Sequence, residues 1–450
     1  MEGLRKVFSC IGKNSEDSKE DAPKSLHKME SVTDSIKATV YGNCIGDAIG
    51  LLSEFMSKTD AEKSYGKHAG KIAYKMKVDD GHRSRWEVGD WTDDSDQMIL
   101  IMKSLLDNEG EVNVVDYSKK LKDWQQHGFE ELGDKGGMGI GTTTVQVLTH
   151  EKFLEDPHAA AEQVWERSNR RVAPNGGVMR TSVAGVYRFN DIEAVIRNTL
   201  SFCKVTHADP RCQASCVAVT TAIAQMLQRK HVDETGRHDA DKIMEESFEH
   251  AKKYLVNAEG SQDEEFVTEF RRHMFAESIS DLQLGEEQKI GYTLKTMGAG
   301  FWAFRQTNFR TALEAVLFEG GDADTNGAVA GALLGCKLGL KAFPKSWLNQ
   351  LLHKTWLDGI LERFIELTET KQTENTATTE EQNAQEEQAA EQDQKPEPDQ
   401  EQEQKPEQEQ EQNEEPQKEE SQQEQEQNGK QIDNSTAIDQ SEVEITTAAD

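Results

Sequence analysis

The stretch GGDADTNGAVAGALLG occupies residues 320–335 and combines an acidic turn with a glycine at every fourth position. Two series share this spacing, and they consist of Gly42, Gly46 and Gly50 in the first and Gly327, Gly331, Gly335 and Gly339 in the second. A glycine inside a helix costs roughly 1 kcal/mol relative to alanine, so a stripe of them is favourable only where another backbone approaches closely. We therefore expect two glycine-striped helices at the centre of the fold, beside the acidic turns.

Apolar residues recur at helical spacing through most of the chain. Between residues 33 and 50, Ile36, Val40, Cys44 and Ala48 stand four apart, which is typical of one face of an α-helix. The same spacing marks residues 96–107, 113–126, 192–204, 211–228, 240–257 and 310–318. Alternating strand patterns are short and few. The sequence predicts an all-α fold, in the form of a single compact domain of many helices.

Composition divides the 450 residues into three parts. Residues 1–30 are polar and predicted to be flexible, whereas 31–368 contain no Pro-, Ser- or Gly-rich linker and are expected to form one domain. From 371 to 450, 5 lysines against 25 acidic residues give a net charge of −20, with 19 glutamines and no aromatic residue. Because such a composition cannot bury enough apolar surface to offset the entropy of ordering, residues 369–450 are predicted to be a disordered tail. Such a tail could solubilise the protein or dock on a basic partner.

Charge and apolar content exclude several classes of protein. The net charge of −32 argues against nucleic-acid binding. No run of eighteen apolar residues and no signal peptide is present, so we expect a soluble monomer of the cytoplasm or nucleus that does not associate with membranes. The six cysteines form no CxxC pair, which predicts reduced, partly buried thiols.

A second acidic turn, WTDDSD at 91–96, precedes the first by more than two hundred residues. Neighbouring carboxylates repel each other by roughly 1 kcal/mol at about 4 Å in water and by roughly 4 kcal/mol at a protein surface. Either turn alone could be a helix cap, with Thr92, Asp324 or Thr325 as the capping residue. Their repetition favours two halves of one site for a hard divalent cation, Mg²⁺ first and then Mn²⁺ or Ca²⁺.

Five motifs in order resemble those of the ADP-ribosylglycohydrolases. They are GDAIGLLSEF (46–55), WTDDSDQM (91–98), PNGGVMRTSVAG (174–185), THADPRC (206–212) and GGDADTNGAVAGALLG (320–335). The resemblance covers nearly the whole expected domain and implies an all-α fold with a central dinuclear metal cleft for two Mg²⁺ or Mn²⁺ ions. The ligands that it implies are Thr92, Asp93, Asp94, Asp322, Asp324 and Thr325.

The resemblance also implies catalytic and ligand-binding residues. Glu54 matches the family's catalytic-loop glutamate, and Asp94 could accept a proton from water at the metal site. The residues that would line the ADP-ribose cleft are Gly139, Gly141 and Thr142 in GGMGIGTTT (136–144), Asn175, Gly176 and Gly177, and His207. One position departs from the pattern, because many bacterial members have an aspartate where this chain has Gly139. We therefore expect fewer carboxylates around the ions.

The reaction implied by the resemblance is hydrolysis at the anomeric carbon of ADP-ribose, attached to a protein or a small acceptor through arginine, serine or an acetyl group. Two carboxylates beside the sugar would supply the acid and the base, and the residues do not assign these roles between Glu54 and Asp94. One alternative is an inactive ADP-ribose-binding or structural protein, as in the crystallin relatives, which is expected to lack some ligands or Glu54. Another is a transferase with Asp322 and Asp324 as its metal motif, which predicts a strand before that motif. The preceding TALEAVLFEG has a helical period instead.

Overall fold

The two glycine-striped segments form helices α2 (Val32–Gly50) and α14 (Ala323–Leu338) in the computed structural model of the protein. The helices pack backbone to backbone: a Cβ added to Gly46 would lie 1.9 Å from the carbonyl oxygen of Gly327, and one added to Gly42 would lie 2.1 Å from that of Gly331. Both helices are buried along nearly their whole length. This confirms the expected close approach at the centre of the fold. Gly339 is not part of the stripe, since it ends α14 with a φ of 74°.

The structure describes residues 31–393, with side chains to residue 373. The helices are α2, α3 (Lys58–Tyr65), α4 (Asp93–Asp107), α5 (Val114–His127), α6 (Thr142–Leu148), α7 (Pro157–Arg167), α8 (Ile192–Lys204), α9 (Pro210–Leu227), α10 (Ala240–Ala251), α11 (Glu264–Met274), α12 (Thr293–Arg305), α13 (Phe309–Glu319), α14, α15 (Lys345–Asn349) and α16 (Lys354–Asp393). No strand occurs among these residues, apart from isolated β-bridges. The prediction of an all-α fold is confirmed.

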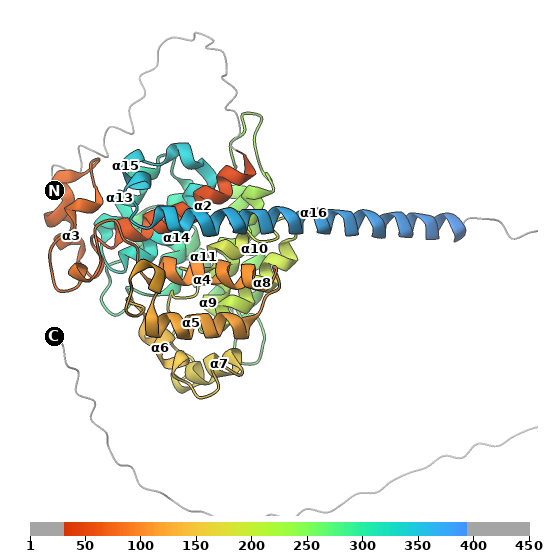
Figure 1. Cartoon of the computed structure of the whole chain (residues 1–450), viewed down its shortest axis with the longest axis horizontal. Coiled ribbons are helices and arrows are strands. Elements are labelled where there is room, and N and C mark those ends of the chain that lie inside the picture. The colour runs from red at the N-terminus through yellow and green to blue at the C-terminus, as the bar shows by residue number, and fades with distance from the viewer. Residues whose placement is uncertain (1–30, 394–450) are drawn as a thin grey trace, which may run out of the picture. The chain divides into compact units, whose positions relative to one another are not determined.

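The other helices surround the central pair in a single bundle. Helices α9 and α12 pack against α14 and are themselves buried on most sides, as expected for core helices. Figure 1 shows α5, α6 and α7 together on one side of the bundle, with α3, α13 and α15 gathered around the opposite side. The acidic turns lie at the starts of α4 and α14, and both helices pack against α2 and against each other, which brings the two turns together.

Helix α16 passes through the boundary expected at 368–369 and continues to Asp393. Its first turns belong to the core, since Leu357, Leu361 and Phe364 are buried and Thr368 is fully buried as well. The predictions for residues 1–30, including Cys10, and for 394–450 lie outside the described residues. The other five cysteines are free and buried. Across 31–393, no helix combines the length and apolarity needed to cross a bilayer.

Replacing Gly46 with alanine is expected to lower the free energy of unfolding by about 3 kcal/mol or more, the upper end of the range for overpacking, because α2 and α14 must separate. The matched control is Gly359→Ala in α16, where an added Cβ meets nothing within 4 Å. That change should raise the free energy of unfolding by up to about 1 kcal/mol through helix propensity. Urea unfolding followed by circular dichroism measures both. Equal stability of the two variants would contradict the backbone contact.

Candidate metal centre and active site

The two acidic turns meet although more than two hundred residues separate them. The hydroxyl of Thr92, at the start of α4, lies 3.1 Å from Oδ2 of Asp94 and 3.5 Å from Oδ2 of Asp324, in the first turn of α14. All three residues are buried. The structure therefore joins the two turns into one acidic cluster, as the repeated pattern predicted.

The helix-capping alternative fails at Thr92, and of the residues predicted to cap α14, Asp324 accepts only one of the described backbone N–H groups, that of the adjacent Thr325 at 2.9 Å. Thr92 and Asp322 occupy the N-cap positions of α4 and α14, but neither side chain accepts a backbone N–H of its own helix. In α4 this role falls to Asp47 of α2, which accepts the N–H of Thr92 and of Ser95, both at 3.0 Å. It also accepts the Ser95 hydroxyl at 2.6 Å. Asp94 is thereby free to face the cluster, whereas Asp96 accepts the indole N–H groups of Trp91 and Trp124 at 2.7 and 3.0 Å.

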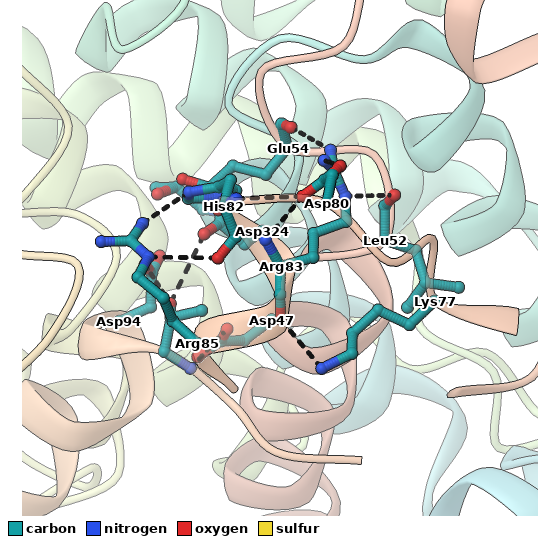
Figure 2. Close-up of polar contacts among 12 residues, drawn as sticks. Asp47, Leu52, Glu54, Lys77, Asp80, His82, Arg83, Arg85, Asp94 and Asp324 are labelled. Atoms are coloured by element: carbon teal, nitrogen blue, oxygen red, sulfur yellow. Dashed lines mark hydrogen bonds and ion pairs between the residues drawn. The ribbon is translucent and has the colours of Figure 1, made fainter. Parts of the chain in front are cut away.

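The cluster fits a divalent cation. One oxygen from each of Asp47, Asp94 and Asp324 can be chosen so that all lie within 4.8 Å of one another, and the same holds for Glu54, Asp322 and Asp324 (Figure 2 labels four of these residues). Oδ1 of Asp94 is buried without a hydrogen-bond partner, which is costly for an oxygen that no cation contacts. No lysine or arginine of the described residues forms an ion pair with these aspartates. Hard oxygen ligands of this kind suit Mg²⁺, Mn²⁺ or Ca²⁺.

Burial and mutual repulsion raise the proton affinity of these aspartates. Burial, opposed by hydrogen bonds from Ser95 and Thr92, raises the pKa of Asp47 to about 7. Burial, followed by the charges of neighbouring carboxylates, raises the pKa of Asp94 and of Asp324 well above the usual range. Carboxylates that bind protons this readily when no cation is present are expected to bind a divalent cation in competition with protons.

Asp93 is held by a side chain of its own helix and limits the size of residue 139. Its Oδ2 accepts the Gln97 amide N–H at 2.8 Å. Gly139 has a φ of 93°, and an added Cβ there would lie 2.4 Å from Oδ1 of Asp93. A side chain at position 139 would therefore strain the backbone and displace Asp93. Glycine at position 139 therefore leaves room for the Asp93 carboxylate.

Asn175 orients Asp322 from the opposite side of the cluster. Its amide nitrogen donates to Oδ2 of Asp322 at 2.7 Å and to the Thr296 hydroxyl at 2.9 Å. Its backbone N–H donates to the carbonyl oxygen of Gly291 at 3.0 Å. The loop that begins with Asn175 is therefore attached both to the acidic cluster and to the segment before α12.

His207 lies in the loop between α8 and α9 and presents one nitrogen to the glycine loop. Arg180 donates to the Thr206 hydroxyl at 2.8 Å, and that hydroxyl lies 2.7 Å from Nδ1 of His207. Burial, and then the charge of Arg180, lowers the pKa of His207 well below its usual value, so the ring is neutral. Nδ1 and the Thr206 hydroxyl thus share one hydrogen bond, which fixes the orientation of the ring. A Cβ added to Gly176 would lie 2.9 Å from Nε2, so this nitrogen faces the glycine loop.

Most of the sequence-predicted residues line one cavity of about 310 Å³. They are Glu54, Asp93, Asp94, Gly139, Gly141, Thr142, Asn175, Gly176, His207, Asp322, Asp324 and Thr325. Thr92 lies behind the cavity wall against Asp94. Gly177 does not line the cavity and packs instead on the sulfurs of Cys203 and Cys216. The structure thus brings residues from six segments of the chain to one cavity.

Comparison with known proteins identifies the family. The sequence profile of the ADP-ribosylglycohydrolases matches residues 28–374. The protein belongs to the ADP-ribosylglycohydrolase family.

Several members of the family resemble this chain along most of their length. The ADP-ribosylarginine hydrolase Tri1 of Serratia proteamaculans is 24% identical over 348 residues, which are 76% of this chain and 82% of that protein. The ADP-ribosyl-[dinitrogen reductase] glycohydrolase of Rhodospirillum rubrum is 23% identical and covers 71% of this chain and 91% of its own length. A solved ADP-ribosylglycohydrolase-related protein complex has a chain with the same fold, with a TM-score of 0.53 and 21% identity over 75% of this chain and 99% of that chain.

Within this ADP-ribosylglycohydrolase fold, the sequence analysis missed Asp47, which completes the acidic cluster. Asp47 is fully buried in α2, between Gly46 and Gly50. The available signal was an acidic residue in the apolar last turns of the helix, CIGDAIG at 44–50, where an ionisable group is rare unless it has partners. Gln97 and Arg180 were also missed, although Arg180 is fully buried and donates to Oε1 of Gln97 at 2.8 Å. Both residues stand within the quoted motifs, but their partners are distant in sequence.

Proposed function

We propose that this protein is a metal-dependent hydrolase that cleaves the glycosidic bond between ADP-ribose and an acceptor and releases ADP-ribose. One observation carries the proposal: the cavity places the Glu54 carboxylate in the same space as the acidic cluster and the glycine loops. A sugar between these groups would have a proton-transferring carboxylate, oxygen ligands for a cation and backbone amides within reach of its substituents. Family membership supports the same reaction class.

The residues that would hold the cations are the six predicted ligands together with Asp47. Asp47 shares one group of oxygens with Asp94 and Asp324, whereas Asp322 and Asp324 share the other with Glu54. Mg²⁺ or Mn²⁺ bound there would act as a Lewis acid, orient the hydroxyls of the ribose and lower the pKa of a bound water. We propose two ions because Asp324 is common to both groups of oxygens.

The remaining chemistry comes from side chains and backbone of the chain. In the proposed hydrolysis a water oxygen forms a bond to the anomeric carbon, and the bond from that carbon to the acceptor breaks with its electron pair. Glu54 and Asp94 are the carboxylates placed to take the proton from the water and to return one to the leaving nitrogen or oxygen. The loop at Gly176, beside Nε2 of the neutral His207, offers backbone N–H groups to the phosphates of ADP-ribose.

The acceptor is proposed from the relatives. Tri1 of Serratia proteamaculans is named for ADP-ribosylarginine, and the Rhodospirillum rubrum enzyme for ADP-ribosylated dinitrogen reductase. We therefore propose arginine-linked ADP-ribose on a protein as the first substrate to examine, with serine-linked ADP-ribose and O-acetyl-ADP-ribose as the alternatives.

A panel of these three substrates with Mg²⁺ tests the proposal. We expect release of ADP-ribose from at least one of them, measured by chromatography, and no release in the same assay with Asp324→Asn. ADP-ribose binding by calorimetry, run in parallel, separates the remaining cases. Binding without turnover of any substrate would favour an ADP-ribose-binding protein, and absence of both would overturn the assignment of the cavity.

A further inference from the structure

Glu54 has a hydrogen-bond partner that lies outside the five motifs by which the sequence resembles the family. Its Oε2 lies 2.6 Å from Nε2 of His82, a residue 28 positions later in the chain (Figure 2). The Glu54 side chain is 9% exposed and that of His82 is 20% exposed, so the contact lies at the edge of the buried site. Among the described residues, Oε1 of Glu54 has no hydrogen-bond partner, and Glu54 lines the cavity.

Arg85 determines which nitrogen of His82 carries the hydrogen. Its Nη2 lies 2.5 Å from Nδ1 of His82, and its Nε donates to the His82 carbonyl oxygen at 3.1 Å. A guanidinium group has donors only, so Nδ1 must accept. The hydrogen of the neutral ring is then on Nε2, which donates to Oε2 of Glu54. The direction of both hydrogen bonds follows from the chemistry of Arg85, which only donates, and of the Glu54 carboxylate, which only accepts.

Two aromatic residues contact the His82 ring. The ring of Phe55 lies 4.9 Å from it, and that of Trp86 lies 5.2 Å away with its edge toward it, both between ring centroids. The backbone N–H of His82 donates to Oδ1 of Asp80 at 3.1 Å. Phe55 has a φ of 60°, which is rare for a large side chain and persists only where the surroundings hold it. Its N–H donates to the carbonyl oxygen of Gly321 at 2.7 Å, which supplies such a constraint.

Arg83 joins the His82 segment to the Glu54 loop. This residue is 4% exposed, and its guanidinium donates to the carbonyl oxygens of Leu52, at 2.8 Å, and of Glu54. Asp80 accepts from the same guanidinium at 2.5 Å. These contacts keep the backbone of both segments in register, so that His82 and the Glu54 carboxylate meet in one orientation.

We propose that His82 is a positioning residue for the hydrolysis: it holds Oε2 of Glu54 so that Oε1 faces the sugar-binding cavity, and Arg85 sets the tautomer in which it does so. The inference rests on the proposed function and adds a residue that acts on the substrate only through Glu54. Nothing else among the described residues bonds the Glu54 carboxylate, so its orientation depends on this one donor.

Substitutions that keep or remove the donor test the role. His82→Leu retains an apolar contact with Phe55 and Trp86 but donates nothing, whereas His82→Gln places an amide N–H near the position of Nε2. Loss of a side chain that orients another typically costs about 10- to 100-fold, so kcat of His82→Leu should fall by that factor with KM and the Kd for ADP-ribose unchanged. His82→Gln should recover most of the loss. The matched control is His231→Leu, which breaks a similar contact of 2.7 Å from Nε2 to Oε2 of Glu246, away from the cavity.

A double-mutant cycle separates an effect through Glu54 from an independent one. In the Glu54→Gln background, His82→Leu should cause no further loss of kcat, because the group that His82 orients no longer transfers a proton. A full additional loss would show that His82 acts on its own. A kcat of His82→Leu within twofold of the wild type would overturn the positioning role while leaving the proposed function intact.

Nuclear magnetic resonance tests the tautomer of His82 without any substrate. In ¹⁵N-labelled full-length protein, the signals of the His82 ring nitrogens are assigned by their absence in His82→Leu. They should show a hydrogen on Nε2 and none on Nδ1. In Arg85→Met, Nε2 should keep its hydrogen because the Glu54 carboxylate only accepts, whereas Nδ1 should no longer be held free of hydrogen. A mixture of tautomers in the wild type would overturn the inference, even if the protein hydrolysed none of the substrates and the proposed function had to be abandoned.

Discussion

Glu54→Gln is expected to lower kcat by a factor on the order of 10² to 10⁴, the usual contribution of a general acid or base. Glutamine has nearly the same shape and can still accept the hydrogen bond from His82, so the loop and the cavity should be unchanged. The change removes the charge of the carboxylate and its ability to transfer a proton. Turnover of the best substrate of the panel, at saturating concentration with Mg²⁺, measures the loss.

Binding experiments separate catalysis from structure in this variant. The Kd for ADP-ribose should stay within about threefold of the wild type, since the product needs no proton transfer to bind. Glu87→Gln, an exposed residue of the same segment as His82, serves as the control and should retain full turnover. Near-wild-type turnover of Glu54→Gln on every acceptor would leave the proton transfers to Asp94 and its neighbours alone.

The second large effect is the loss of activity when divalent cations are removed. Treatment with EDTA should abolish turnover, and Mg²⁺ should restore it, because buried carboxylates without a counter-ion repel one another and cannot hold the sugar. Asp324→Asn should weaken binding of both the cation and ADP-ribose, since Asp324 belongs to both groups of oxygens. Turnover that survives exhaustive EDTA treatment would rule out the metal site.

The pH dependence of stability tests cation binding at the acidic cluster without any substrate. An unfolded aspartate has a pKa of about 3.9, whereas that of Asp47 in the fold is about 7. Between these values the folded protein binds more protons than the unfolded chain, so the metal-free protein should lose stability as pH rises from about 4 to about 7. Bound Mg²⁺ replaces those protons. The rise in Tm on adding Mg²⁺ should therefore be larger at pH 8 than at pH 5.

The rise in Tm can be measured by scanning calorimetry, and two variants serve as controls. Asp324→Asn should lose most of the Mg²⁺-dependent rise in Tm at pH 8. Asp263→Asn changes the N-cap of α11, where asparagine caps as well as aspartate, and should keep the full rise. An equal rise in Tm at both pH values, in the wild type, would contradict competition between protons and the cation.

The features that sequence reasoning predicted are those that depend on neighbours close along the chain. Apolar spacing predicted α8 over 192–204, where the structure has Ile192–Lys204, and the glycine series predicted the packing of α2 at the centre. The acidic turns predicted a cluster because neighbouring carboxylates repel each other even in an isolated peptide, and a bound cation would offset that repulsion. Periodicity and local charge are properties of the sequence itself, so they need no knowledge of the fold.

The tertiary structure decided which distant groups complete the site. The local sequence predicts Thr92 as a helix cap, yet the residue that accepts backbone N–H groups at the start of α4 is Asp47, 45 residues earlier in the chain. From the local sequence Gly139 is an ordinary loop glycine, yet in the fold the Asp93 carboxylate leaves no room for a larger side chain at this position. The sequence around His82 does not indicate a functional role, and His82 meets Glu54 only because two loops come together in the fold. Hydrogen bonds and steric contacts act over a few ångströms in space, and segments far apart in sequence come that close only through the packing of the whole bundle.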